Sequence, residues 1–192
     1  MRSLVLSCLA AVVISGCSEQ QAVSVSEPAE LTGEAIGHHC QMIVLDHPGP
    51  KAQVHLAGNL EPLWFTQIRD AIAFERMPEE TAEIAAIFVS DMGAAASWDS
   101  PGTDNWIDAR TAHYVVGSNR SGGMGAPELV PFALREKADD FAGRQGGTVI
   151  GFAAITDEMV LAPVDVDPQS AENGGHHVEP ESPHQHGGET QG

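Results

Sequence analysis

The aromatic residues of this 192-residue chain are confined to one stretch, which limits where a hydrophobic core can form. All three Trp, the single Tyr and all six Phe lie within residues 40–164. Residues 18–39 and 165–192 carry acidic residues but no Lys, Arg or aromatic side chain. We therefore predict a folded domain over residues 40–164, a flexible tether over residues 17–39 and a disordered, acidic, His-rich tail over residues 165–192.

The charge of the chain excludes one broad class of partner. Its formal net charge is −18, from 27 acidic and 9 basic residues. A surface this acidic repels the phosphates of nucleic acids and anionic lipids, so nucleic acid is excluded as a partner. The same surface is compatible with handling cations.

The first 16 residues have the pattern of an export signal. Arg2 precedes an apolar run from Leu4 to Ile14, which is too short to span a membrane. The string V-I-S-G-C that ends at Cys17 resembles the lipobox of bacterial lipoproteins, which are cleaved before the cysteine and lipidated on it. The resemblance implies a lipid anchor at Cys17 in the cell envelope, facing the periplasm. In bacterial lipoproteins an Asp directly after the lipidated cysteine resembles a signal for retention in the inner membrane. Ser18 stands at that position here and favours the outer membrane. An ordinary cleavage site before a Cys is the alternative.

The cysteines leave one free thiol in the exported chain. Cys8 is lost with the signal and Cys17 is capped by lipid, so Cys40 has no intramolecular partner and a disulfide framework is excluded. A lone thiol in an oxidising compartment is exposed to oxidation unless it is buried or holds a metal.

A weak internal repeat predicts the fold. Three pairs match at an offset of 67 residues: Phe65 with Phe132, Ala71 with Ala138, and Phe74 with Phe141. We predict an α+β fold of two ββαβ modules, at about 40–91 and 105–164, packed together with mixed or antiparallel sheets. The expected elements are strands at 40–45, 51–57 and 84–90 with a helix at 61–76, then strands at 106–108, 112–116 and 148–155 with a helix at 131–144.

Cys40 and Met42 form the sharpest chemical pattern. If residues 40–45 form a strand, side chains alternate and these two lie on one face, about 6.6 Å apart between Cα atoms. A thiolate with a thioether is a soft donor set that favours Cu(I) over Zn(II). The alternative is a buried Cys and a Met that fills a gap in the core.

Other side chains could extend such a site. Met124 lies in a flexible, glycine-flanked loop and Met92 lies at a strand end, although packing is the more common role of such a methionine. His38 and His39 adjoin Cys40 and could add imidazole ligands. The four His residues of the tail either collect divalent ions loosely or only solvate the tail.

Residues 40–53, C-Q-M-I-V-L-D-H-P-G-P-K-A-Q, resemble the C-G-M-x-V-x-D-H-P-G-P-K-A-Q stretch of the NosL family. This family comprises lipoprotein copper chaperones for the assembly of nitrous oxide reductase. The strings W-I-D-A-R at 106–110, Y-V-V-G-S at 114–118, M-G at 124–125 and V-P-F at 130–132 are similar to its second half. The resemblance covers about residues 36–160.

The resemblance implies two ββαβ modules and Cu(I) bound by Cys40 and Met42, with Met124 as the third ligand. It also implies copper delivery to the multicopper centre of the reductase, without turnover by the chaperone. Gln41 stands where the family motif has Gly, a change that narrows backbone freedom but leaves both sulfurs in place.

Two other functions stay open from the residues alone. Cys40 could be the nucleophile of a thiol-dependent envelope enzyme, with a neighbouring His as base. The chain could also be a non-catalytic lipoprotein binding module with a merely buried Cys40. Met42 separates these interpretations, since only a metal site needs its thioether. The sequence contains no Gly-rich phosphate loop, H-E-x-x-H or G-x-S-x-G motif. Association into a homodimer also stays open.

Overall fold

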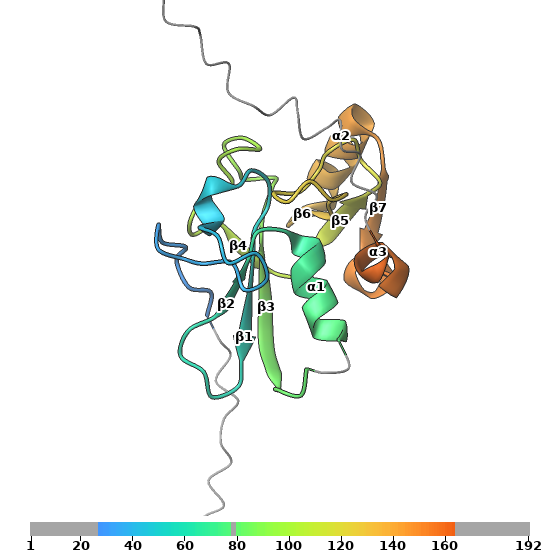
Figure 1. The fold of residues 1–192 in the computed structure, drawn as a ribbon. Helices are drawn as coiled ribbons and strands as arrows, with labels where there is room; N and C mark the ends of the chain where they lie inside the picture. Colours follow the sequence, from blue (N-terminus) through green and yellow to red (C-terminus); the bar gives the residue numbers. More distant parts are fainter. Residues whose placement is uncertain (1–26, 78–79, 164–192) are drawn as a thin grey trace, which may run out of the picture.

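The computed structural model describes residues 27–77 and 80–163, and these residues form two antiparallel sheets. The first sheet has the strand order β2-β1-β3-β4 and the second has the order β6-β5-β7. Helix α1 leads from β2 to β3 and helix α2 leads from β6 to β7 (Figure 1). The prediction of an α+β fold with two ββαβ units is therefore confirmed. The elements are β1 (Ala52–Leu56), β2 (Leu63–Phe65), α1 (Ile68–Arg76), β3 (Ile84–Ser90), β4 (Trp106–Asp108), β5 (His113–Val116), β6 (Val130–Phe132), α2 (Arg135–Gln145) and β7 (Thr148–Gly151).

The repeat at an offset of 67 residues is the strand-to-helix junction of each unit. Phe65 ends β2 and Phe132 ends β6, and each helix begins three residues later. The predicted helices over 61–76 and 131–144 therefore begin too early. Their first residues are short edge strands, which suit the aromatic side chains of β2. Pro131 fits in β6 because an edge strand can leave its missing N–H on the open side.

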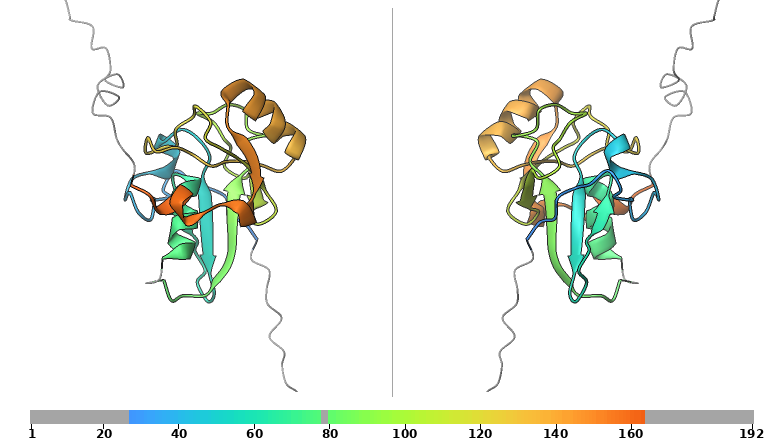
Figure 2. Two further views of the ribbon diagram at one scale, coloured as in Figure 1. Left: turned by 90° about the vertical axis from the view of Figure 1, so that its right-hand side faces the viewer. Right: turned by 90° about the vertical axis from the view of Figure 1, so that its left-hand side faces the viewer.

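Strand β4 belongs to the first sheet, where Ser90 of β3 faces Trp106. The strand predicted over residues 106–108 is present, but the prediction that it belongs to the second ββαβ module is wrong, because β5 and β6 are the two strands that precede α2. The predicted strand over 148–155 ends at Gly151, and the chain continues as the 3-10 helix η2 (Phe152–Ala154) and helix α3 (Asp157–Leu161). Helix α3 packs against α1 (Figure 2).

The two sheets share a core. Ile72 and Phe74 of α1 are buried in one cluster with Val54 of β1 and Tyr114 of β5. Helix α2 covers a smaller cluster on the second sheet, in which Phe141 packs against Phe132 with ring centroids 5.3 Å apart. Helix α1 is thus fixed by both sheets, and its N-terminal end is held where the candidate site lies.

Part of the predicted tether is folded. Leu31 and Ala35 are buried against Val44, beneath Trp64 and Trp106. A buried side-chain amide also ties this segment to β1, since Gln53 accepts from Ala29 N at 2.8 Å and donates to Ala29 O at 3.0 Å. The prediction of a flexible tether through residue 39 is therefore wrong for residues 29–37. Its acidic composition suggested disorder, but two apolar side chains are enough to anchor this segment on the domain.

The predicted signal, the lipidated Cys17 and the His-rich tail lie outside the described residues. Among the helices that the structure describes, none has the length and apolar character needed to cross a membrane.

Candidate functional site

Cys40 lies in a tight turn between Gly37 and Met42. Gly37 N donates to Met42 O at 2.8 Å and Gln41 N donates to Gly37 O at 2.9 Å. The residues that flank the turn, Ile36 and Ile43, form an antiparallel bridge. The predicted strand over 40–45 is wrong, because this turn is followed by the 3-10 helix η1 (Val44–Asp46). The turn is fixed to β2, where Trp64 O accepts from His38 N at 2.7 Å.

The turn leaves both predicted sulfur ligands within reach of solvent. Cys40 is half-buried, and its Sγ lies 3.9 Å from Thr66 Oγ1 and over Gly37. Met42 is 40% exposed although it is apolar. Because this segment is not a strand, the alternation that placed both side chains on one face does not apply. Their convergence on one ion stays a prediction.

The two histidines beside Cys40 rest on the aromatic core. The His38 ring lies 5.3 Å from Phe74, edge to face, and the His39 ring lies 5.2 Å from Phe65 in the same way. Burial lowers the pKa of His39, and the charge of His38 lowers it further, while Asp70 opposes both. The neutral imidazole is the form that coordinates a metal, so this surrounding favours the ligand form of His39.

Met124 is presented by a hairpin turn whose ends, Ser121 and Pro127, form a bridge. The turn is packed closely against the rest of the molecule. Gly123 O lies 3.1 Å from Nδ1 of His47, and a Cβ on Gly123 would lie 3.0 Å from the carbonyl oxygen of Thr66. The prediction of a flexible loop therefore has to be corrected, because these glycines serve close approach to neighbouring backbone.

Met124 and His39 line the same cavity, which has a volume of about 370 Å³ and runs along α1. Asp70 and Met77, from the two ends of α1, line it as well. Helix α3 forms the opposite wall, where Arg69 donates to the carbonyl oxygen of Ala162. The structure thus brings Met124 next to the Cys40 turn through His39, whereas Cys40 and Met42 do not line this cavity.

Two other methionines are placed by the structure. Met77, which is outside the predicted ligand set, lines the cavity and is 37% exposed. The spacing of Asp70, Ala73 and Met77 along α1 is the signal that would have placed it on the cavity side. Met92 packs instead against the small core under α2, so its packing explanation holds.

Within residues 27–77 and 80–163, no three His, Cys, Asp or Glu side chains are grouped so that they could hold a metal ion. The Cys40 turn carries a thiol, the thioether of Met42 and the imidazoles of His38 and His39, and the cavity beside it is lined by the thioethers of Met77 and Met124. Thiolate and thioether donors select soft ions such as Cu(I), and imidazole accepts both copper and zinc.

The fold and the site define a class of protein: an α+β domain that carries side chains able to bind a soft metal ion on turns beside a helix. Comparison with known proteins is more specific. The NosL family model matches residues 28–160, and the chain belongs to the NosL family.

The similarity between this chain and its relatives extends over most of their sequences. The chain is 54% identical to the copper-binding lipoprotein NosL of Achromobacter cycloclastes over 162 residues, which cover 84% of this chain and 83% of the relative. It is 34% identical to the copper-binding lipoprotein NosL of Stutzerimonas stutzeri over 173 residues, or 90% and 86% of the two chains. The crystal structure of the copper chaperone NosL from Shewanella denitrificans superimposes with a TM-score of 0.63 at 28% identity, covering 68% of this chain and 96% of that one.

Proposed function

We propose that this protein is a membrane-anchored Cu(I) chaperone, without turnover of its own, that binds copper through Cys40, Met42 and Met124. The observation that carries the proposal is the turn from Gly37 to Met42, which presents a half-buried thiol and an exposed thioether two residues apart. The similarity of the chain to two copper-binding lipoproteins supports copper as the bound ion.

Exposure of the ligands suits release as well as binding. Met42 and Met124 are 40% and 41% exposed, so the donors of an acceptor protein can approach the ion from solvent. The Cys40 thiolate anchors Cu(I), and neutral thioethers complete the shell without adding charge. Copper then leaves by stepwise ligand exchange, in which each incoming donor replaces one methionine before the thiolate lets go.

The acceptor in this proposal is nitrous oxide reductase with its assembly machinery. A lipid on Cys17 holds the chaperone on the periplasmic side of the envelope, in the outer membrane, while the folded domain reaches the acceptor. The likeness of the fold to the copper chaperone from Shewanella denitrificans supports transfer as the task. The −18 charge of the chain offers complementarity to a basic face of an acceptor.

The binding step is tested by anaerobic, reducing titration of the domain with Cu(I) against a competing chelator. We expect one Cu(I) per chain, a large loss of affinity in Cys40→Ala, and smaller losses in Met42→Leu and Met124→Leu. Met159→Leu is the matched control, because Met159 is 36% exposed but lies on α3, outside the proposed ligand set. Unchanged affinity in Cys40→Ala would overturn the proposal.

The transfer step is tested by mixing Cu(I)-loaded protein with copper-free nitrous oxide reductase and following copper content after separation. We expect transfer from the wild type and a clear loss with Cys40→Ala loaded under the same conditions. Equal copper uptake by the reductase from free chelated Cu(I) and from the loaded protein would contradict a chaperone role.

A further inference from the structure

Glu128 is a buried carboxyl group that serves the N-terminus of a helix 60 residues away in the chain. Its Oε1 accepts hydrogen bonds from Ile68 N at 3.2 Å, Arg69 N at 3.4 Å and Leu129 N at 2.9 Å. Gln67, at the N-cap position of α1, makes no side-chain capping bond of its own. Glu128 therefore supplies the acceptor that the first N–H groups of α1 need.

The second oxygen of Glu128 faces the hairpin that carries Met124. Oε2 has no hydrogen-bond partner among the described residues. A Cβ on Gly122 would overlap this oxygen and would lie 2.7 Å from Oε1 of Gln67. The carboxyl of Glu128 and the amide of Gln67 thus meet over Gly122, two residues before Met124.

Gln67 completes the connection to Met124. Its Oε1 accepts from Met124 N at 3.1 Å, and its Nε2 donates to Asp70 Oδ2 at 2.9 Å. The amide is therefore oriented at both ends: Asp70 on the first turn of α1 fixes the nitrogen, and the oxygen is left to hold the hairpin.

We propose that Glu128 is a positioning residue for Met124: it locks the start of α1 to the hairpin, so that Gln67 holds the thioether of Met124 at the cavity beside His39. This inference rests on the proposed function, since it takes Met124 as a copper ligand. It assigns a role to two residues outside the ligand set.

A purely local role explains Glu128 less well. Ser or Asn at position 67 would cap α1 without burying a carboxyl group, and burial of an unpartnered oxygen is costly. A cap supplied from residue 128 does something that a local cap cannot do, because it joins the helix to the segment that follows Met124. Burial raises the pKa of Glu128 and the charge of Asp70 raises it further, against backbone N–H donors and Lys51, so a neutral carboxyl suits this place.

A double-mutant cycle tests the inference with Cu(I) and a competing chelator as the probe. Substitution of residues that orient the ligands of a metal site costs about 10–100-fold in affinity, so we expect Glu128→Ala to weaken Cu(I) binding about tenfold. In a Met124→Leu background the same substitution should cause no further loss of Cu(I) affinity. X-ray absorption should show one sulfur neighbour fewer in Glu128→Ala. Equal losses in both backgrounds, or no loss in either, would overturn the inference.

Two further variants keep the test decisive if Glu128→Ala folds poorly. Glu128→Gln can accept from the same three N–H groups and donate toward Gln67 Oε1, so it should retain wild-type affinity. Gln67→Ala leaves the Glu128 cap intact and removes the acceptor for Met124 N, so it should lose affinity as Glu128→Ala does. Wild-type affinity in Gln67→Ala contradicts the inference. Wild-type affinity in Met124→Leu rejects Met124 as a ligand and the inference with it, while the Cys40→Ala result judges the proposed function separately.

Discussion

Gln41 has a backbone φ of 57°, a left-handed conformation that favours glycine, at the position where the NosL motif has Gly. Its Nε2 donates to His38 O at 2.7 Å, which offsets part of the strain. We predict that Gln41→Gly raises the free energy of unfolding by about 1 kcal/mol, because the Cβ clash is removed. Gln41→Ala, which keeps the Cβ and loses the hydrogen bond, should be less stable than the wild type. Urea denaturation checks this order, and a Gly variant less stable than the Ala variant would contradict it.

The residue types of the site could be predicted from the sequence, but their surroundings could not. Cys40 and Met42 stand out as soft donors by chemistry and spacing, and Met124 is added as a ligand by the resemblance to the NosL motif. Packing of His39 on Phe65, and capping of α1 by Glu128, join residues that are distant in the chain and leave no local pattern. Met77 illustrates the same limit, because its cavity position becomes visible only once the start of α1 is known.

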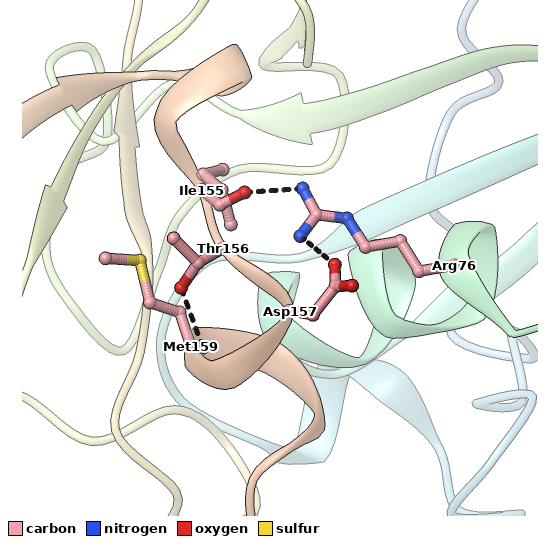
Figure 3. A network of polar contacts seen from close by, with 5 residues as sticks. All are labelled: Arg76, Ile155, Thr156, Asp157 and Met159. Atoms are coloured by element: carbon pink, nitrogen blue, oxygen red, sulfur yellow. Dashed lines mark hydrogen bonds and ion pairs between the residues drawn. The ribbon is translucent and has the colours of Figure 1, made fainter.

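At the scale of the element, two arginine side chains of α1, Arg69 and Arg76, bind α3 and the residues at its ends, and Val160 packs α3 into the shared core. Arg76 donates from Nη1 to Asp157 Oδ1 and from Nη2 to Ile155 O, each at 2.8 Å, and Thr156 caps the helix by accepting from Met159 N (Figure 3). Since α3 has only five residues, it depends on these contacts. It forms one wall of the cavity, so its attachment determines the cavity's shape.

We predict that Arg76→Ala loosens α3 without unfolding the domain. Asp157 is 75% exposed, so the ion pair itself contributes little, and the lost bond to the Ile155 carbonyl matters more. Backbone amide hydrogen exchange should be faster at Asp157–Leu161, and the free energy of unfolding of the whole domain should fall by about 1 kcal/mol. Arg135→Ala is the matched control, because the Arg135–Asp139 pair lies at 3.6 Å on the exposed face of α2. Unchanged protection of α3 in Arg76→Ala would contradict this assignment.

The elements that the sequence predicted well are those with strong local signals. Strand β3 has its predicted bounds, since its apolar run lies between polar segments. The repeat located both strand-to-helix junctions, although short strands before them were merged into the helices. A stretch of three residues such as Val130–Phe132 is too short for its periodicity to distinguish strand from helix.

At the scale of the whole molecule, two buried ionisable groups lie beneath the site. Lys51 donates from Nζ to Gly49 O at 2.7 Å and to Pro48 O at 3.0 Å, and so fixes the turn next to His47. Burial lowers the pKa of Lys51 to about 8, against the opposing charge of Glu128. Unfolded Lys51 keeps its proton up to its ordinary pKa of 10.5, so this group makes stability rise with pH only above about pH 8.

Glu128 changes the stability of the fold in a lower pH range than Lys51 and in the opposite direction. Burial raises its pKa from 4.5 to about 8, so between these values the native state keeps a proton that the unfolded state has lost. The stability that Glu128 contributes is therefore complete below about pH 4.5 and is lost as pH rises toward 8. We predict that the free energy of unfolding of the wild type, relative to Glu128→Gln, falls by a few kcal/mol from pH 5 to pH 8. Because the two proteins differ only at residue 128, the difference isolates Glu128. Urea denaturation at each pH measures it, and parallel curves for the two proteins would show that Glu128 is already ionised in the native state at pH 5.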